Sequence, residues 1–120
     1  MTKEELVDRS ERREHPRYAV NIEVEVHIDT EAISGLLVDI SIAGLRIKLP
    51  RLVKPSADMV VTFSAEEEVR IFSQAVWTLE KSYAGLPSYL VGLKIQSILV
   101  NNHDMQGMAE RTAFLDKLLQ

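Results

Sequence analysis

Apolar and polar residues alternate along most of the chain, which is the pattern of β-strands with one buried face. The alternation is strictest over residues 20–28, where every even position is aliphatic. Shorter segments of the same kind follow, separated by turn-forming residues. The pattern predicts six strands, at residues 20–28, 33–38, 45–49, 59–63, 69–79 and 89–95. Residues 81–88, with a glycine and a proline, are expected to form a loop. Six short strands favour a closed or nearly closed antiparallel barrel, because closure leaves no strand edge unpaired.

The period changes near the C-terminus, where apolar residues recur every three or four positions. This predicts an amphipathic helix over residues 104–119, capped by Asn101 or Asn102 and weakened in its first turn by Gly107. Its apolar stripe is expected to comprise Met105, Met108, Thr112, Leu115 and Leu119, widened by Phe114 and Leu118. We expect the helix to cover one mouth of the barrel. A contact with a partner or a second copy is the alternative.

The composition narrows the class of protein. Of the 120 residues, 46% are hydrophobic and 27% are charged, as is usual for one globular domain. The sequence shows neither a membrane-spanning run nor a secretory leader, so we expect a cytoplasmic protein. The absence of cysteine excludes disulfides and thiol catalysis. Three scattered histidines predict no metal site, and a net charge of −4 argues against a general binder of nucleic acids or membranes.

Two polar motifs interrupt this scaffold pattern. The first is Arg13-x-x-x-Arg17, in a charged N-terminal segment, and the second is Asp39-x-Ser41-x-x-Gly44, between two predicted strands. Asp39 and Ser41 lie two residues apart, which places both side chains on one side of an extended backbone. Gly44 permits either a positive φ or the close approach of a ligand to its backbone. Taken alone, the second motif is equally well explained by a turn closed by side-chain hydrogen bonds.

Taken together and in this order, the two motifs resemble the signature of the PilZ domain family, bacterial receptors for the second messenger cyclic di-GMP. The resemblance covers nearly all of residues 9–120. It implies a single domain over residues 1–120, made of a flexible N-terminal arm (1–16), a six-stranded β-barrel (17–97) and a C-terminal helix (101–120). It also implies that the protein is not an enzyme and needs no cofactor. A hydrolase is disfavoured because no G-x-S-x-G motif occurs.

The proposed ligand carries two phosphates and two guanines, and arginine matches both. Its planar fork bonds phosphate oxygens and also the O6 and N7 atoms of guanine, whereas aspartate accepts from the guanine N1 and N2 donors. The resemblance therefore implies that arginines bind phosphates and guanine edges. Asp39 and Ser41 would hold the other guanine edge or the strand connection. The predicted ligand-binding residues are Arg12, Arg13, Arg17, Asp39, Ser41 and Gly44. Arg9 and Trp77 are additional candidates, although Trp77 equally fits a position in the core.

The resemblance also bears on stoichiometry and signalling. Family members with an arginine at the position of Arg12 tend to bind the dinucleotide as an intercalated pair. Ordering of the arm around the ligand would create a new surface for an unidentified downstream protein, so the chain would act as an adaptor. The alternative is a PilZ-like module that contacts proteins and binds no nucleotide. Neither nucleic acid nor membrane is an expected partner.

Overall fold

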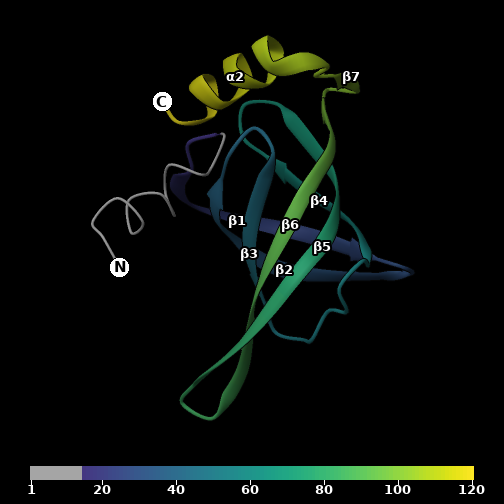
Figure 1. Cartoon of the computed structure of the whole chain (residues 1–120), viewed down its shortest axis with the longest axis vertical. Helices are drawn as coiled ribbons and strands as arrows, with labels where there is room; N and C mark the ends of the chain where they lie inside the picture. The colour runs from purple at the N-terminus through teal and green to yellow at the C-terminus, as the bar shows by residue number, and fades with distance from the viewer. Residues whose placement is uncertain (1–14) are drawn as a thin grey trace, which may run out of the picture.

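The structure, a computed structural model, describes residues 15–120 except the side chains of Ser82 and Tyr83. The described elements are β1 (Tyr18–Ile28), β2 (Glu31–Ile40), β3 (Gly44–Leu49), β4 (Asp58–Ser64), β5 (Glu68–Tyr83), β6 (Leu86–Val100), β7 (His103–Asp104) and α2 (Gly107–Leu118). Strand β3 pairs with both β2 and β6, which closes the antiparallel sheet into a barrel (Figure 1). The predicted six-stranded antiparallel barrel is confirmed. Most of the predicted N-terminal arm lies outside the described residues.

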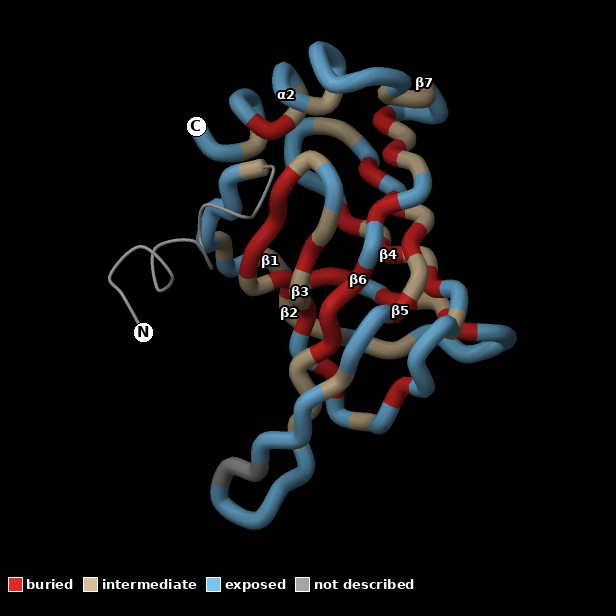
Figure 2. The backbone as a smooth tube through the Cα atoms, viewed as in Figure 1, coloured by how far each residue is buried: buried red, intermediate tan, exposed pale blue. Residues whose placement is uncertain are grey.

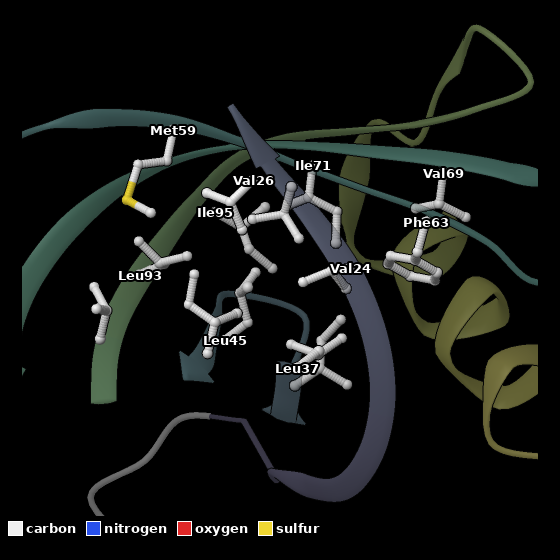
Figure 3. Close-up of a cluster of buried hydrophobic side chains, with 14 of the residues drawn as sticks. Val24, Val26, Leu37, Leu45, Met59, Phe63, Val69, Ile71, Leu93 and Ile95 are labelled. Carbon is white, nitrogen blue, oxygen red and sulfur yellow. The ribbon is translucent and has the colours of Figure 1, made fainter. Parts of the chain in front are cut away.

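The hydrophobic core fills the inside of the barrel. On β1, for example, Val24, Val26 and Ile28 are buried while the residues between them face outward. Figure 2 shows buried positions recurring along the other strands, and Figure 3 shows core side chains from several strands pointing toward one another. Each such side chain contributes about 1.5–3 kcal/mol through burial. The alternation in the sequence therefore corresponds to the inner and outer faces of one barrel.

The hairpin formed by β5 and β6 is longer than predicted. Pairing continues to Tyr83 and Leu86, so the loop predicted at residues 81–88 is wrong except at its tip. The turn residues Ala84 and Gly85 have φ values of 52° and 80°, and positive values of this kind are required by two-residue hairpin turns. The hairpin therefore projects beyond the barrel, at the end opposite α2 (Figure 1).

A register irregularity at Val76 changes the face of the sheet to which the side chains of β5 point. The cross-strand pairing shifts between Ala75 and Trp77. Before the shift Ala75 is buried, and after it Trp77 is 37% exposed and Leu79 is also exposed. A bulge inserts one residue here and moves the following side chains, Trp77 and Leu79 among them, to the other face of the strand. The core position considered for Trp77 is therefore not the one it occupies.

Helix α2 lies across one end of the barrel, where the predicted cover was expected (Figure 1). It begins at Gly107, and its N-cap Gln106 makes no capping hydrogen bond through its side chain. The predicted cap at Asn101 or Asn102 is wrong, because both residues have positive φ in the turn between β6 and β7. The side chain of Asn101 instead accepts a hydrogen bond from the backbone N–H of Glu68 at 3.1 Å.

The buried face of α2 is narrower than the predicted stripe. Leu115 is buried in the core, and Phe114 and Leu118 pack against it. Met108, however, is 60% exposed. The predicted stripe is also wrong at Thr112 and Leu119, which are exposed. The helix begins at Gly107 and does not include residues 104–106. Its buried face consists of the apolar side chains that contact the barrel, not of every apolar residue in the helix.

Candidate ligand-binding site

A cavity of about 390 Å³ lies beside the second motif, a volume typical of small-molecule sites. Its wall includes three residues of the predicted site, Arg17, Ser41 and Gly44. Trp77 of β5 lies in the same wall, which brings together segments that are far apart in the sequence. The structure thus places most of the described candidates around one cavity.

Ser41 closes the connection between β2 and β3. Its Oγ accepts hydrogen bonds from the backbone N–H groups of Ala43 at 3.2 Å and Gly44 at 3.1 Å. The backbone N–H of Ser41 donates to the carbonyl oxygen of Gly44 at 2.8 Å. These contacts form the turn that was the simpler explanation for the motif. The side chain of Ser41 is therefore already engaged in holding the connection.

Gly44 is required by close packing rather than by its φ. A Cβ at this position would lie 2.9 Å from the carbonyl oxygen of Leu93, which real Cβ atoms essentially never do. Among residues 15–120, the glycines with positive φ are Gly85 and Gly107. The predicted positive φ is not observed, and the close approach that was predicted for a ligand is made here by another strand. The group that approaches is the backbone of β6.

Asp39 makes contacts of a different kind. It is only 5% exposed, and both Nε and Nη2 of Arg46 bond its Oδ2, with Nε at 2.5 Å. Nη1 of Arg17 lies 4.0 Å from the other oxygen, Oδ1, which is beyond hydrogen-bonding distance. Within the described part of the chain, Oδ1 is buried and has no hydrogen-bond partner. The carboxylate is therefore satisfied on one oxygen only.

Trp77 lies over Gly92 of β6. A Cβ on Gly92 would overlap Cε2 and Nε1 of the indole and lie 2.7 Å from Cζ2, so glycine alone leaves room for this ring. Trp77 is paired with Gly92, Gly92 with Arg46, and Arg46 with Asp39. Residues paired directly across strands share one face of a sheet. These four residues therefore form one row across β5, β6, β3 and β2.

Sequence reasoning missed two cations near the motif. Lys94 lines the cavity, and Arg46 holds Asp39. Both are charged residues among apolar ones in their strands, which marks them as outward-facing. Only the strand register, which the sequence does not display, brings them to the motif.

Helix α2 supports the strand connection. The guanidinium of Arg111 donates to the carbonyl oxygens of Ile42 at 3.1 Å, Gln96 at 3.2 Å and Met105 at 3.3 Å. Ile42 belongs to the connection that Ser41 closes, and Gln96 belongs to β6. The helix, the connection and β6 are therefore joined at one residue.

Three predicted ligand contacts, Arg9, Arg12 and Arg13, lie outside the described residues. Among residues 15–120, no group of three or more histidine, aspartate and glutamate side chains is placed to hold a metal ion. No helix in that same span is both long and apolar enough to cross a membrane.

The described chain is thus a closed antiparallel β-barrel with a helix across one end and a cavity beside the connection between β2 and β3. Residues 11–106 match the model of the PilZ domain, and the chain belongs to this family. The matched residues contain both motifs, so the resemblance predicted from them is confirmed at the level of the family.

Solved structures with the same fold include three proteins of low sequence identity. The inhibitor of motility MotI/DgrA of Bacillus subtilis has a TM-score of 0.61 and 16% identity, over 90% of this chain and 49% of that one. PlzA of Borreliella burgdorferi, solved with c-di-GMP, has a TM-score of 0.61 and 11% identity, over 97% and 55%. MrkH of K. pneumonia, also solved with c-di-GMP, has a TM-score of 0.64 and 13% identity, over 89% and 51%. The chain thus spans about half the length of each. A comparison with curated protein sequences found no match.

Proposed function

We propose that this protein is a receptor for cyclic di-GMP and that the cavity beside residues 39–44 is the binding site. The observation that carries the proposal is a cavity lined by Arg17 and Trp77, with Arg17 lying 4.0 Å from the buried carboxylate oxygen Oδ1 of Asp39. Membership of the PilZ family supports it, as do the complexes of PlzA and MrkH with this dinucleotide.

Each side chain has chemistry that suits one part of the ligand. The guanidinium of Arg17 binds a phosphate or the O6 and N7 edge of a guanine. The partly exposed indole of Trp77 offers a flat surface on which a base stacks. The ammonium of Lys94 supplies a second positive charge for a ligand with two phosphates. Oδ1 of Asp39 accepts from the N1 and N2 donors of guanine.

Ser41 and Gly44 shape the wall rather than carry charge to the ligand. Because the oxygen of Ser41 is bonded to two backbone amides, its main contribution is a fixed connection. Gly44 keeps β3 close to β6 at the edge of the cavity. Both residues are therefore ligand-site residues through the surface that they form.

The arm completes the site in this proposal. Arg12 and Arg13, with Arg9 as a further phosphate contact, would reach the ligand from the segment before Arg17, and Arg12 would favour an intercalated pair of ligands. The ligand supplies the negative charge that offsets repulsion among these arginines. The ordered arm would then form a surface for a downstream protein, so that the domain works as an adaptor.

The direct test is a calorimetric titration with cyclic di-GMP, with GMP and cyclic di-AMP as controls. Arg17→Ala and Asp39→Asn are each expected to weaken binding by about 1–3 kcal/mol, the usual effect of losing a charged or bidentate contact. Arg51→Ala is the matched control, because Arg51 pairs with Glu31 and does not line the cavity. Two ligands bound per chain would support the role given to Arg12.

A folded wild-type protein that binds no cyclic di-GMP would exclude the receptor function. The alternative would then be a PilZ-like module that contacts proteins. The exposed apolar residues of the projecting hairpin favour that alternative, since Leu86 at its tip is 70% exposed and Leu79 is also exposed.

A further inference from the structure

The contact between Arg46 and Asp39 has a geometry that bears on ligand recognition. The two residues are direct cross-strand partners in β2 and β3. Two nitrogen atoms of Arg46, Nε and Nη2, bond the same carboxylate oxygen, Oδ2. The other oxygen, Oδ1, is buried and unpartnered within the described residues. The arginine thus fixes the orientation of the carboxylate and places a positive charge beside it.

We propose that Arg46 is a positioning residue for cyclic di-GMP. It holds Asp39 so that Oδ1 is left as the acceptor for guanine, and it keeps Arg17 available for the ligand. This inference rests on the proposed function, because it deepens the description of the same site.

The charge balance around Asp39 is the first argument. A buried carboxylate requires a close positive partner, and removing that partner leaves a costly uncompensated charge. Arg46 is the partner here, and Arg17 stands 4.0 Å from Oδ1. Without Arg46, the guanidinium of Arg17 would be drawn onto the carboxylate. With Arg46 in place, Arg17 and Lys94 remain in the cavity wall to face two phosphates.

Access to Oδ1 is the second argument. This oxygen is buried, so a ligand donor reaches it only after a neighbouring group has moved. Arg17 lies both in the cavity wall and near Oδ1. When Arg17 turns toward a phosphate or a guanine edge, the same movement exposes the oxygen. Arg46 keeps the carboxylate in place during this exchange because its planar fork makes two bonds to it.

Guanine specificity follows from this arrangement. Oδ1 is an acceptor, and guanine presents donors at N1 and N2. Hypoxanthine lacks only the N2 amino group, so cyclic di-IMP tests whether that donor is read. The inosine analogue keeps the N1 donor but loses one of the two donors that guanine offers to Oδ1, so a moderate loss of affinity is expected.

The experiment compares the affinities of cyclic di-GMP and cyclic di-IMP for the full chain and its variants. The wild type is expected to prefer cyclic di-GMP by about tenfold or more. Arg46→Lys keeps the positive charge but not the planar fork, and it is expected to reduce this preference by severalfold while the protein stays folded. Arg46→Met removes the charge as well and is expected to weaken binding of both ligands further. Arg51→Lys and Arg51→Met are the matched controls and should behave as the wild type.

Several outcomes would overturn the inference. Folded Arg46 variants that retain the wild-type preference would show that Arg46 does not position Asp39. An equal loss of affinity for both ligands in Arg46→Lys would mean that Arg46 contacts the phosphates or supports the fold only. A wild type that binds both ligands equally would show that Oδ1 does not accept from the N2 amino group, which overturns the inference and leaves the receptor function intact. No binding of either ligand by the wild type would instead exclude the proposed function itself, and with it this inference.

Discussion

Asp39 and the turn at residues 41–44 belong to one short motif, yet their polar groups are satisfied to very different degrees. In the turn, the Oγ of Ser41 accepts two backbone hydrogen bonds, and the backbone N–H of Ser41 donates to the carbonyl oxygen of Gly44. Asp39, two residues before Ser41, is bonded at Oδ2, whereas its Oδ1 is buried without a hydrogen-bond partner among residues 15–120. Buried polar groups in proteins are normally paired, so the exception calls for a function.

The difference separates two tasks within one motif. The turn at residues 41–44 stabilises the connection and shapes the wall of the cavity. The pair of Asp39 and Arg46 fixes the position of Oδ1 of Asp39 near Arg17, which lines the cavity. If this division is right, substitutions on the two sides should have different effects on stability and on binding.

The largest loss of stability is expected for Asp39→Ala. The substitution removes the buried partner of Arg46 and should lower the free energy of unfolding by about 2–3 kcal/mol, the usual range for hydrogen bonds to charged groups. Urea unfolding of the two proteins measures this difference. A loss no greater than that of Ser41→Ala would contradict the contrast between the two halves of the motif.

Ser41→Ala is expected to cost less. The backbone amides of Ala43 and Gly44 lose a partly buried acceptor, which should lower the free energy of unfolding by about 1–2 kcal/mol. Affinity for cyclic di-GMP should fall less than with Asp39→Asn. Ser34→Ala, on the exposed side of β2, is the control and should change neither quantity. An equal loss of affinity for Ser41→Ala and Asp39→Asn would make Ser41 a direct ligand contact.

Gly92→Ala tests Trp77, which lies at the other end of the cross-strand row that begins at Asp39. The added methyl group must displace the indole of Trp77, at a stability cost of about 1 kcal/mol. Because Trp77 is the only tryptophan in the sequence, its fluorescence emission should shift as the ring leaves its place. Binding of cyclic di-GMP should weaken at the same time. An unchanged spectrum with unchanged binding would show that this glycine does not position the ring.

The smallest effect is expected outside both regions, at the exposed pair of Lys117 and Glu67. The hydrogen bond and charge of Glu67 raise the pKa of Lys117 above its ordinary value of 10.5. The pair therefore stabilises the fold below that ordinary pKa, and the contribution is lost as pH rises through the raised pKa. Lys117→Met should lower the melting temperature slightly at neutral pH, with no difference above the raised pKa. Its affinity for cyclic di-GMP should equal that of the wild type.

Much of the fold was predictable because burial imposes a period of two on each strand. The strict alternation at residues 20–28 corresponds to β1, and the connection between β2 and β3 lies at residues 41–43, within the segment 39–44 where the sequence predicts it. The bulge at Val76 was not predictable, because one inserted residue leaves the composition of the strand unchanged while reversing the facing of Trp77. The start of α2 was missed because helical spacing continued upstream into residues 104–106.

The candidate site was predictable only in its motif residues. The motif residues Asp39, Ser41 and Gly44 lie within one short segment of the sequence. Their proximity therefore required no knowledge of the fold. The contact of Arg46 with Asp39 depends on the register of β2 against β3, and the contact of Trp77 with Gly92 depends on that of β5 against β6. Strand register is fixed by long-range pairing, which no local pattern displays.

The most direct test of the central claim is a fluorescence titration of the wild-type protein with cyclic di-GMP. The sole tryptophan, Trp77, lines the proposed cavity, so its emission reports on that location. Binding there predicts a saturable change in emission, with the same midpoint as the calorimetric titration and no response to GMP at equal concentrations. Calorimetric saturation without any change in the emission of Trp77 would place the ligand elsewhere on the protein and contradict the site.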